Sequence, residues 1–154
     1  MSPILTVDAV DNLLAMPIGH LGETEWREVP QAQVDAFAKA TEDHQWIHVD
    51  PDRARTGPYG ATIAHGMLTL SLVPSFIVEL VDVASASAVL NYGFDRVRFV
   101  VAPVPVGSRI RGAVMVKEVK EVRDGVRVTF TVEVSAEGAP TCACVADLLL
   151  LWVR

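Results

Sequence analysis

Residues 66–83, with the sequence GMLTLSLVPSFIVELVDV, contain the most apolar stretch of the chain. Several polar residues and Pro74 interrupt it, which is typical of a buried core helix and not of a membrane span. We therefore predict a helix from Gly66 to about Val83. Because proline lacks the N–H that a helix needs, we expect a kink or break at Pro74.

The sequence that follows this helix is rich in valine, which favours β-strands. Four such runs cover residues 90–101, 108–121, 126–136 and 141–153. Asp124-Gly125 lies between the second and third runs and is typical of a tight hairpin, so we expect an antiparallel meander. A long apolar helix beside a meander is buried on all sides only if the sheet curves around it. The pattern predicts an α+β fold with a curved antiparallel sheet wrapped around a long central helix.

The N-terminal part of the chain is expected to contribute shorter elements. Apolar spacing predicts a helix over residues 6–15 that Thr6 caps, and a short strand over residues 22–28. A second helix is expected over residues 31–41, directly after Pro30. A length of 154 residues fits one ordinary domain. No internal repeat or linker divides the sequence, so we predict one domain over residues 1–154.

The charge balance excludes two classes of partner. The chain has 13 Lys and Arg against 19 Asp and Glu, a net charge of −6, whereas a nucleic-acid binder or a protein held on anionic lipid needs a basic face. The first residues lack the basic and apolar regions of a signal peptide. Cys142 and Cys144 are too close for an ordinary disulfide and too few for a zinc site. We therefore expect a cytoplasmic protein without a nucleic-acid or membrane partner.

The longest segment without periodic hydrophobicity covers residues 42–64, and loops of this kind often carry function. Asp43 and His48 lie within it. A carboxylate and an imidazole together hold one water molecule, since each accepts or returns a proton. Trp46 and Ile47 would shield such a pair from bulk water. Two solvated side chains are the alternative that the composition leaves open.

Gly66 begins the predicted central helix, where main-chain N–H groups have no helical partner. Because Gly66 has no side chain, a carbonyl could approach its N–H, which would then act as an oxyanion donor; tight packing of the helix start is the alternative. His65 is either a ligand-facing or a hydrogen-bonded structural histidine. His44 and His48 are four residues apart, but no glutamate lies between them as in H-E-x-x-H, and Pro51 follows. We therefore predict no metal site.

Two motifs occur in a specific order. Residues 40–51 read ATEDHQWIHVDP, and residues 62–67, at the start of the central helix, read TIAHGM. These motifs resemble the MaoC-like dehydratase family and, within it, the R-specific enoyl-CoA hydratases and the nodulation protein N-like branch. Residues 91–99, NYGFDRVRF, and 103–107, PVPVG, are also similar to that branch. The resemblance extends from about Thr6 to the C-terminus.

This resemblance implies a hot-dog fold, in which a curved antiparallel sheet wraps a long central helix. It implies a homodimer with the active site at or near the subunit interface. The implied substrate is an acyl thioester of coenzyme A, and the reaction is reversible syn addition of water to a trans-2-enoyl thioester. The product is an (R)-3-hydroxyacyl thioester. No cofactor is expected beyond the coenzyme A that the substrate carries.

The resemblance also assigns site residues. It places the catalytic aspartate at Asp43, the catalytic histidine at His48 and the oxyanion N–H at Gly66. Gln45 stands where the family has asparagine, and it can still donate a hydrogen bond in support. His65 is a second candidate for a supporting role.

Besides Gln45, three further departures from the family pattern are visible. Glu42 replaces the glycine that usually precedes the aspartate, and an added carboxylate there would shift the titration of Asp43 unless it points to solvent. Trp46 replaces a proline. The segment between Arg98-Phe99 and Pro103-Val104, residues 100–102, is one residue longer than in the family. This added residue predicts a bulge at a strand end.

The sequence leaves several questions open, among them the acyl chain length and whether coenzyme A or an acyl carrier protein carries the substrate. Arg96 and Arg98 are candidates for contacts with coenzyme A phosphates, but for at least one of them a surface ion pair is the favoured interpretation. Besides a hydratase, the same fold is compatible with an acyl-CoA thioesterase or with a non-catalytic subunit that binds an acyl chain or a partner.

Overall fold

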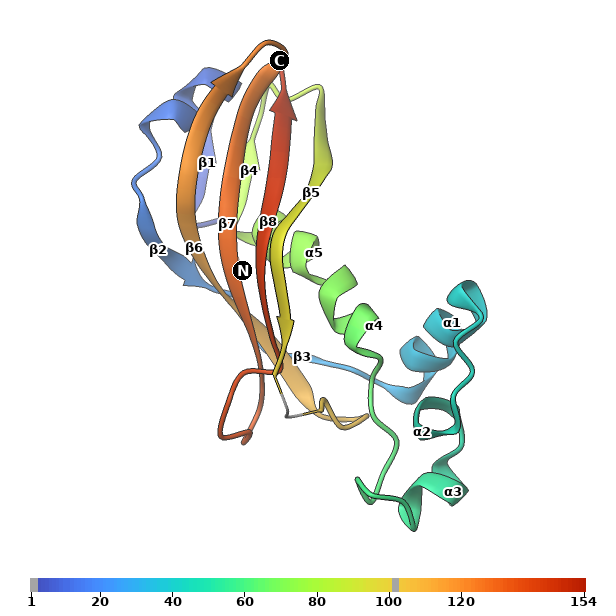
Figure 1. Ribbon diagram of the computed structural model, residues 1–154. Coiled ribbons are helices and arrows are strands. Elements are labelled where there is room, and N and C mark those ends of the chain that lie inside the picture. The colour runs from blue at the N-terminus through green and yellow to red at the C-terminus, as the bar shows by residue number, and fades with distance from the viewer. Residues whose placement is uncertain (1–2, 101–102) are drawn as a thin grey trace.

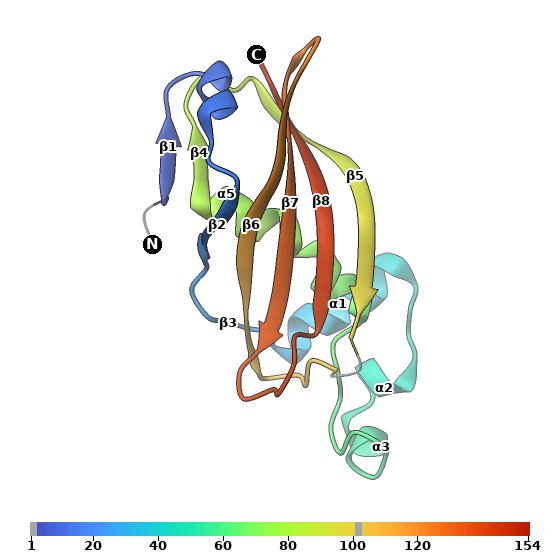
Figure 2. The ribbon, with the colours of Figure 1, turned by 60° about the vertical axis from the view of Figure 1, so that its left-hand side comes forward.

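The computed structural model describes residues 3–100 and 103–154. Most of the molecule is an antiparallel sheet with the strand order β2-β6-β7-β8-β5, in which β3 also pairs with β6. Its strands are β2 (Gly19–Glu23), β3 (Arg27–Glu28), β5 (Ala88–Phe99), β6 (Arg109–Val122), β7 (Gly125–Ala136) and β8 (Cys144–Val153). Figures 1 and 2 show that the long strands bend along their length, so the predicted curved antiparallel sheet is confirmed.

The predicted central helix lies against one face of this sheet, in two pieces, α4 (Gly66–Ser71) and α5 (Val73–Leu80) (Figure 1). Its buried side chains meet every second residue of the strands, because alternate strand residues point to the same face. The helix contributes Leu68, Leu70, Val73, Phe76, Ile77 and Leu80, and the strands contribute Val114, Val128, Phe130, Val132, Ala146, Leu148 and Leu150. Full burial of each large apolar side chain stabilises the fold by roughly 1.5–3 kcal/mol.

The sheet does not enclose the central helix on all sides, and this part of the prediction is wrong for the single chain. Met67 of α4 and Val78 of α5 are 58% and 51% exposed. The arrangement is otherwise the hot-dog fold that the resemblance implied. The open flank of the helix lies next to β5, which forms one edge of the sheet.

The break in the central helix comes slightly earlier than predicted. Pro74 lies in the first turn of α5, so the helical run is interrupted at Leu72, which belongs to neither piece. A proline in the first turn loses no hydrogen bond, whereas in the helix interior its ring would collide with a preceding carbonyl. The helix also ends at Leu80 and not at Val83, since residues 81–83 form strand β4 (Val81–Val83).

The N-terminal prediction is partly wrong. Instead of one helix over residues 6–15, the chain forms strand β1 (Leu5–Val7) and a 3₁₀ helix, η1 (Val10–Ala15). β1 pairs in parallel with β4, and this long-range partner outweighs the helical spacing. The expected strand over residues 22–28 is divided between β2 and β3, while the helix over residues 31–41 is confirmed as α1 (Gln31–Thr41).

The four predicted long strands all form, but their order differs from a simple meander. β6, β7 and β8 are consecutive neighbours, with the predicted hairpin at Asp124-Gly125. β5 pairs with β8 and not with β6, so it lies at the far edge. The expected bulge over residues 100–102 falls partly outside the described residues, and the register shifts within β5 lie between Asn91 and Gly93 and between Phe94 and Arg96.

The segment predicted as irregular contains two short helices, α2 (Trp46–Val49) and α3 (Pro51–Arg55). Together with α1 they form a group at one end of the sheet, near the start of α4 (Figures 1 and 2). None of the helices in the described ranges is long and apolar enough to cross a membrane. This arrangement brings Asp43, between α1 and α2, and His48, within α2, close to the start of the central helix.

Candidate active site

The end of α1 places Asp43 beside the central helix. Glu42, the residue after α1, adopts a left-handed conformation with φ 62° and ψ 17°, which turns the chain sharply. Asp43 follows on the exposed side of this turn, and α2 begins three residues later. Glycine adopts left-handed φ values most readily, so this geometry fits the glycine that the resemblance implies at position 42.

His48 is held by the main chain of the loop that leads to α4. His48 is only 7% exposed, and its Nδ1 lies 2.7 Å from the carbonyl oxygen of Ile63. A carbonyl oxygen only accepts, so Nδ1 donates this hydrogen bond. The neutral ring therefore carries its proton on Nδ1 and keeps Nε2 as an acceptor.

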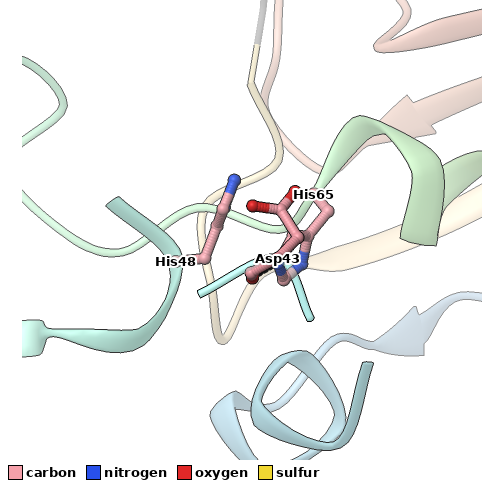
Figure 3. A group of neighbouring side chains, drawn as sticks. All are labelled: Asp43, His48 and His65. Atoms are coloured by element: carbon pink, nitrogen blue, oxygen red, sulfur yellow. Dashed lines mark hydrogen bonds between the residues drawn. The ribbon is translucent and has the colours of Figure 1, made fainter. Parts of the chain in front are cut away.

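Asp43, His48 and His65 converge, as Figure 3 shows. A carboxylate oxygen of Asp43 and one ring nitrogen from each histidine all lie within 4.8 Å of one another. One water molecule with two hydrogen bonds of about 2.8 Å holds its partners roughly 4.6 Å apart. The spacing suits a single bound water between the carboxylate and an imidazole, which is the arrangement predicted for Asp43 and His48.

The same three residues are a possible set of metal ligands, and the ring geometry bears on that reading. The His48 and His65 rings are stacked, with centroids 3.8 Å apart and planes 26° from parallel. Stacked rings direct their in-plane lone pairs side by side, whereas two histidines on one metal ion must direct them to a common point. The stacked rings are an argument for water, and the absence of a metal ion at this site stays a prediction.

Gly66 and His48 line one cavity of about 140 Å³. Most of the other residues that line it are apolar, and they are Ile63, Ala64, Phe99, Val100, Pro103, Val104 and Ala143, with Thr69 the remaining polar one. Gly66 is the first residue of α4, and no side chain caps this helix start within the described residues. Its main-chain N–H has no partner within the helix, and a hydrogen bond from it to a substrate carbonyl stays a prediction.

Burial lowers the pKa of His48 below its ordinary value of about 6.5. Removal of the ring from water is the largest cause, and the nearby His65 acts in the same direction. The hydrogen bond to the Ile63 carbonyl and the charge of Asp43 oppose this shift. His48 is therefore neutral near pH 7 and able to accept a proton.

This shift predicts how stability depends on pH. Since the folded state disfavours protonated His48, the unfolded chain binds more protons below about pH 6.5. The free energy of unfolding should decrease as the pH falls from about 6.5 towards the lowered pKa of His48. Above that range His48 is neutral in both states, so this loss of stability should be absent. Urea titrations of the wild type and of His48→Gln between about pH 5 and 8 measure the effect. The same slope in both proteins would contradict the assignment to His48.

The two residues expected to support the site, Gln45 and His65, contribute different groups to it. Gln45 has an exposed side chain, and its main-chain carbonyl accepts a hydrogen bond from the His48 N–H at 2.9 Å. His65 is only 2% exposed, and its Nε2 lies 3.0 Å from the main-chain oxygen of Asp43. The structure thus brings the His65 side chain into the site, whereas Gln45 contributes its main chain.

Gln31 in α1 also organises the site, although its sequence context does not identify it. Its Nε2 donates to the main-chain oxygen of His48 at 2.7 Å, and its Oε1 accepts from the Thr62 hydroxyl at 2.6 Å. One side chain therefore joins α1, α2 and the loop before α4. Nothing in the local sequence distinguishes Gln31 from an exposed helical glutamine, because both partners are distant in the chain.

Arg96 and Arg98 do not reach the cavity in this chain. In the sheet Arg96 lies opposite Asp147 and Arg98 opposite Val145, whereas Phe99 lies opposite Cys144 and lines the cavity. The Arg96 Nε is 3.3 Å from the carboxylate of buried Asp147, so Arg96 forms the ion pair that the sequence left open. Arg98 remains exposed, and its contact with phosphate stays a prediction.

The left-handed turn at Glu42 predicts a stabilising substitution. The side chain is exposed, and a non-glycine residue in this conformation costs about 1–2 kcal/mol. Glycine also loses more backbone entropy on folding, which offsets part of this gain. Glu42→Gly should therefore raise the free energy of unfolding by roughly 0.5–1 kcal/mol. Denaturant unfolding measures this change. Glu42→Gln removes the charge and keeps the strain, so equal stabilisation by both variants would contradict the argument from the backbone.

Comparison with known proteins identifies the family of this chain. The family model described as MaoC like domain matches residues 15–138. The chain is 42% identical over 149 residues to 3-hydroxyacyl-thioester dehydratase Z of Mycobacterium tuberculosis, with 96% of this chain and 98% of that protein covered. It is 45% identical over 125 residues to Nodulation protein N of Rhizobium leguminosarum bv. viciae, covering 78% and 77% of the two chains.

Among solved structures, the (R)-hydratase from A. caviae involved in PHA biosynthesis has the same fold. Its TM-score is 0.72 at 24% sequence identity, with 89% of this chain and 97% of that chain covered. The expected enzyme class, a hydro-lyase, agrees with the names of these relatives. From the family match and the close relatives we conclude that the chain belongs to the MaoC-like dehydratase family.

Proposed function

We propose that this protein is an (R)-specific enoyl-CoA hydratase. In this proposal it adds water reversibly to a trans-2-enoyl-CoA and forms an (R)-3-hydroxyacyl-CoA. The observation that carries the proposal is the convergence of the Asp43 carboxylate and the His48 ring beside a cavity that His48 and Gly66 line. The 42% identical relative, named as a 3-hydroxyacyl-thioester dehydratase, supports a thioester substrate.

In this mechanism Asp43 and His48 hold one water molecule on one face of the substrate double bond. As the water oxygen bonds to C3, its O–H bond breaks and the proton passes to the pair. The electrons of the double bond move towards the thioester carbonyl, whose oxygen gains negative charge. The pair then returns a proton to C2 on the same face. This sequence accounts for syn addition, because the oxygen and the proton arrive from one side.

The Gly66 N–H would stabilise the charge on the thioester oxygen. One well-placed oxyanion donor contributes roughly 3 kcal/mol to the transition state. A positioned acid–base group contributes about 10²–10⁴-fold to the rate. The apolar walls of the cavity strengthen both effects, because electrostatic interactions are stronger away from water. The proposal needs no metal ion and no cofactor beyond the coenzyme A of the substrate.

We propose further that the protein is a homodimer in which β5 faces the second subunit. β5 is an edge strand, and its side chains Val89, Leu90, Tyr92 and Phe99 are exposed. An edge strand presents unpaired main-chain groups, and these exposed apolar residues favour a partner chain. Since Phe99 also lines the cavity, the second subunit would lie beside the active site.

We also propose a cytoplasmic location. Cys142 is half-buried and Cys144 is buried, and both thiols are free. Burial raises the pKa of the Cys144 thiol to about 11, so it remains protonated and unreactive. Free structural thiols are typical of a reducing compartment.

Crotonyl-CoA in deuterium oxide tests the reaction. We expect the absorbance of the enoyl thioester to decrease, and (R)-3-hydroxybutyryl-CoA to accumulate with one deuterium at C2 on the side of the new hydroxyl group. Release of free coenzyme A would instead identify a thioesterase. Tight binding of the thioester without turnover would identify a non-catalytic subunit, and either result would contradict the proposal.

A further inference from the structure

His65 occupies a specific place between the two proposed catalytic residues. Its ring is stacked on that of His48 at 3.8 Å, and Phe37 of α1 packs nearby with its ring centroid 5.0 Å away. The Nε2 atom lies 3.0 Å from the main-chain oxygen of Asp43, which is 22 residues distant in the chain. His65 is 2% exposed, so these contacts form in the interior.

The hydrogen bond from His65 constrains the segment that carries Asp43. A carbonyl oxygen accepts only, so the Nε2–H of His65 donates to it. Asp43 itself is exposed and follows the strained turn at Glu42, so local sequence does little to hold it. Because His65 directly precedes Gly66, its buried ring connects this exposed segment to the start of α4. One side chain thus links all three parts of the site.

We propose that His65 is a positioning residue, which sets the separation of Asp43 and His48 chiefly through its hydrogen bond to the Asp43 main chain, with its ring stack on His48 in support. This inference rests on the proposed hydratase function. His65 acts through its two neighbours, Asp43 and His48. The other ring nitrogen of His65, Nδ1, is buried and has no hydrogen-bond partner among the described residues. A misplacement of about 1 Å at reacting groups costs roughly 100-fold in rate. His65 therefore affects turnover more than substrate binding.

Two variants separate the two contacts. His65→Phe keeps an aromatic ring against His48 but has no hydrogen-bond donor, whereas His65→Gln keeps an amide donor for the Asp43 carbonyl and loses the ring. We expect His65→Phe to lower kcat for crotonyl-CoA about 100-fold, with KM changed less than about threefold. His65→Gln should recover at least about tenfold of this loss. Unchanged kcat in His65→Phe, or equal losses in both variants, would overturn the proposal.

A second measurement is independent of catalysis. Because the proximity of His65 lowers the pKa of His48, an NMR titration of the His48 ring should show this pKa higher in both variants than in the wild type. The groups that face His48 are Asp43 and His65, so Asp43→Asn serves as the opposite control and should lower it. A His48 pKa that does not move in either His65 variant would overturn the inference. If the wild type hydrates no enoyl-CoA, the proposed function fails and this titration alone decides the role of His65.

Discussion

Asp43→Asn and His48→Gln should each reduce kcat for crotonyl-CoA hydration by about 10³-fold. Asparagine cannot accept a proton from water, and glutamine cannot exchange one. The double variant should lose little more than either single variant, because the two groups hold the same water and act as a unit. Steady-state kinetics of the three variants and the wild type measure the effect.

Neither substitution should unfold the protein. Asp43 is exposed, and glutamine at position 48 retains a donor for the Ile63 carbonyl. Glu42→Gln is a matched control, because it neutralises an exposed carboxylate directly beside Asp43 and should keep kcat within about twofold. Thermal unfolding of each variant checks that the fold persists. Folded variants that retain hydration would contradict the roles of Asp43 and His48.

Gly66→Ala should reduce kcat/KM about 100-fold. A β-carbon at this position would lie 3.2 Å from the Cδ1 and Cε1 atoms of Phe99, so the ring must shift by a few tenths of an ångström. The methyl group also keeps a thioester carbonyl away from the Gly66 N–H, and loss of one oxyanion donor costs about 10²–10³-fold. Alanine favours helices more than glycine does, so stability should not suffer from the backbone.

The Phe99 ring supplies the control for this variant. In Gly66→Ala combined with Phe99→Ala, the crowding with the ring is relieved but the methyl group still blocks the amide. We expect the double variant to stay as inactive as Gly66→Ala. Recovery of activity would show that the ring had blocked the site, and full activity in Gly66→Ala alone would show that the N–H has no part in the reaction.

Local sequence was enough to predict the features that depend on neighbours in the chain. The apolar run after Gly66, the Val-rich strands and the Asp124-Gly125 hairpin all form, as does the helix over residues 31–41. The proximity of Asp43 to His48 also follows from a short separation in the chain. These features need only hydrophobic periodicity, turn chemistry and short chain distances.

Features that depend on distant partners were missed or wrong. The pairing of β5 with β8, and of β1 with β4, joins segments that the sequence does not mark as neighbours. The ion pair of Arg96 with Asp147 depends on that pairing, because it forms across β5 and β8. The two hydrogen bonds of Gln31 likewise become visible only when α1 is packed beside α2. Tertiary contacts select among local possibilities in each case.

A crystal structure with (R)-3-hydroxybutyryl-CoA bound tests the central claim most directly. We expect the C3 hydroxyl oxygen to lie within about 3 Å of both the Asp43 carboxylate and the His48 Nε2, and the thioester oxygen to accept a hydrogen bond from the Gly66 N–H. A ligand whose hydroxyl group lies away from Asp43 and His48, with its thioester oxygen on other donors, would contradict the account.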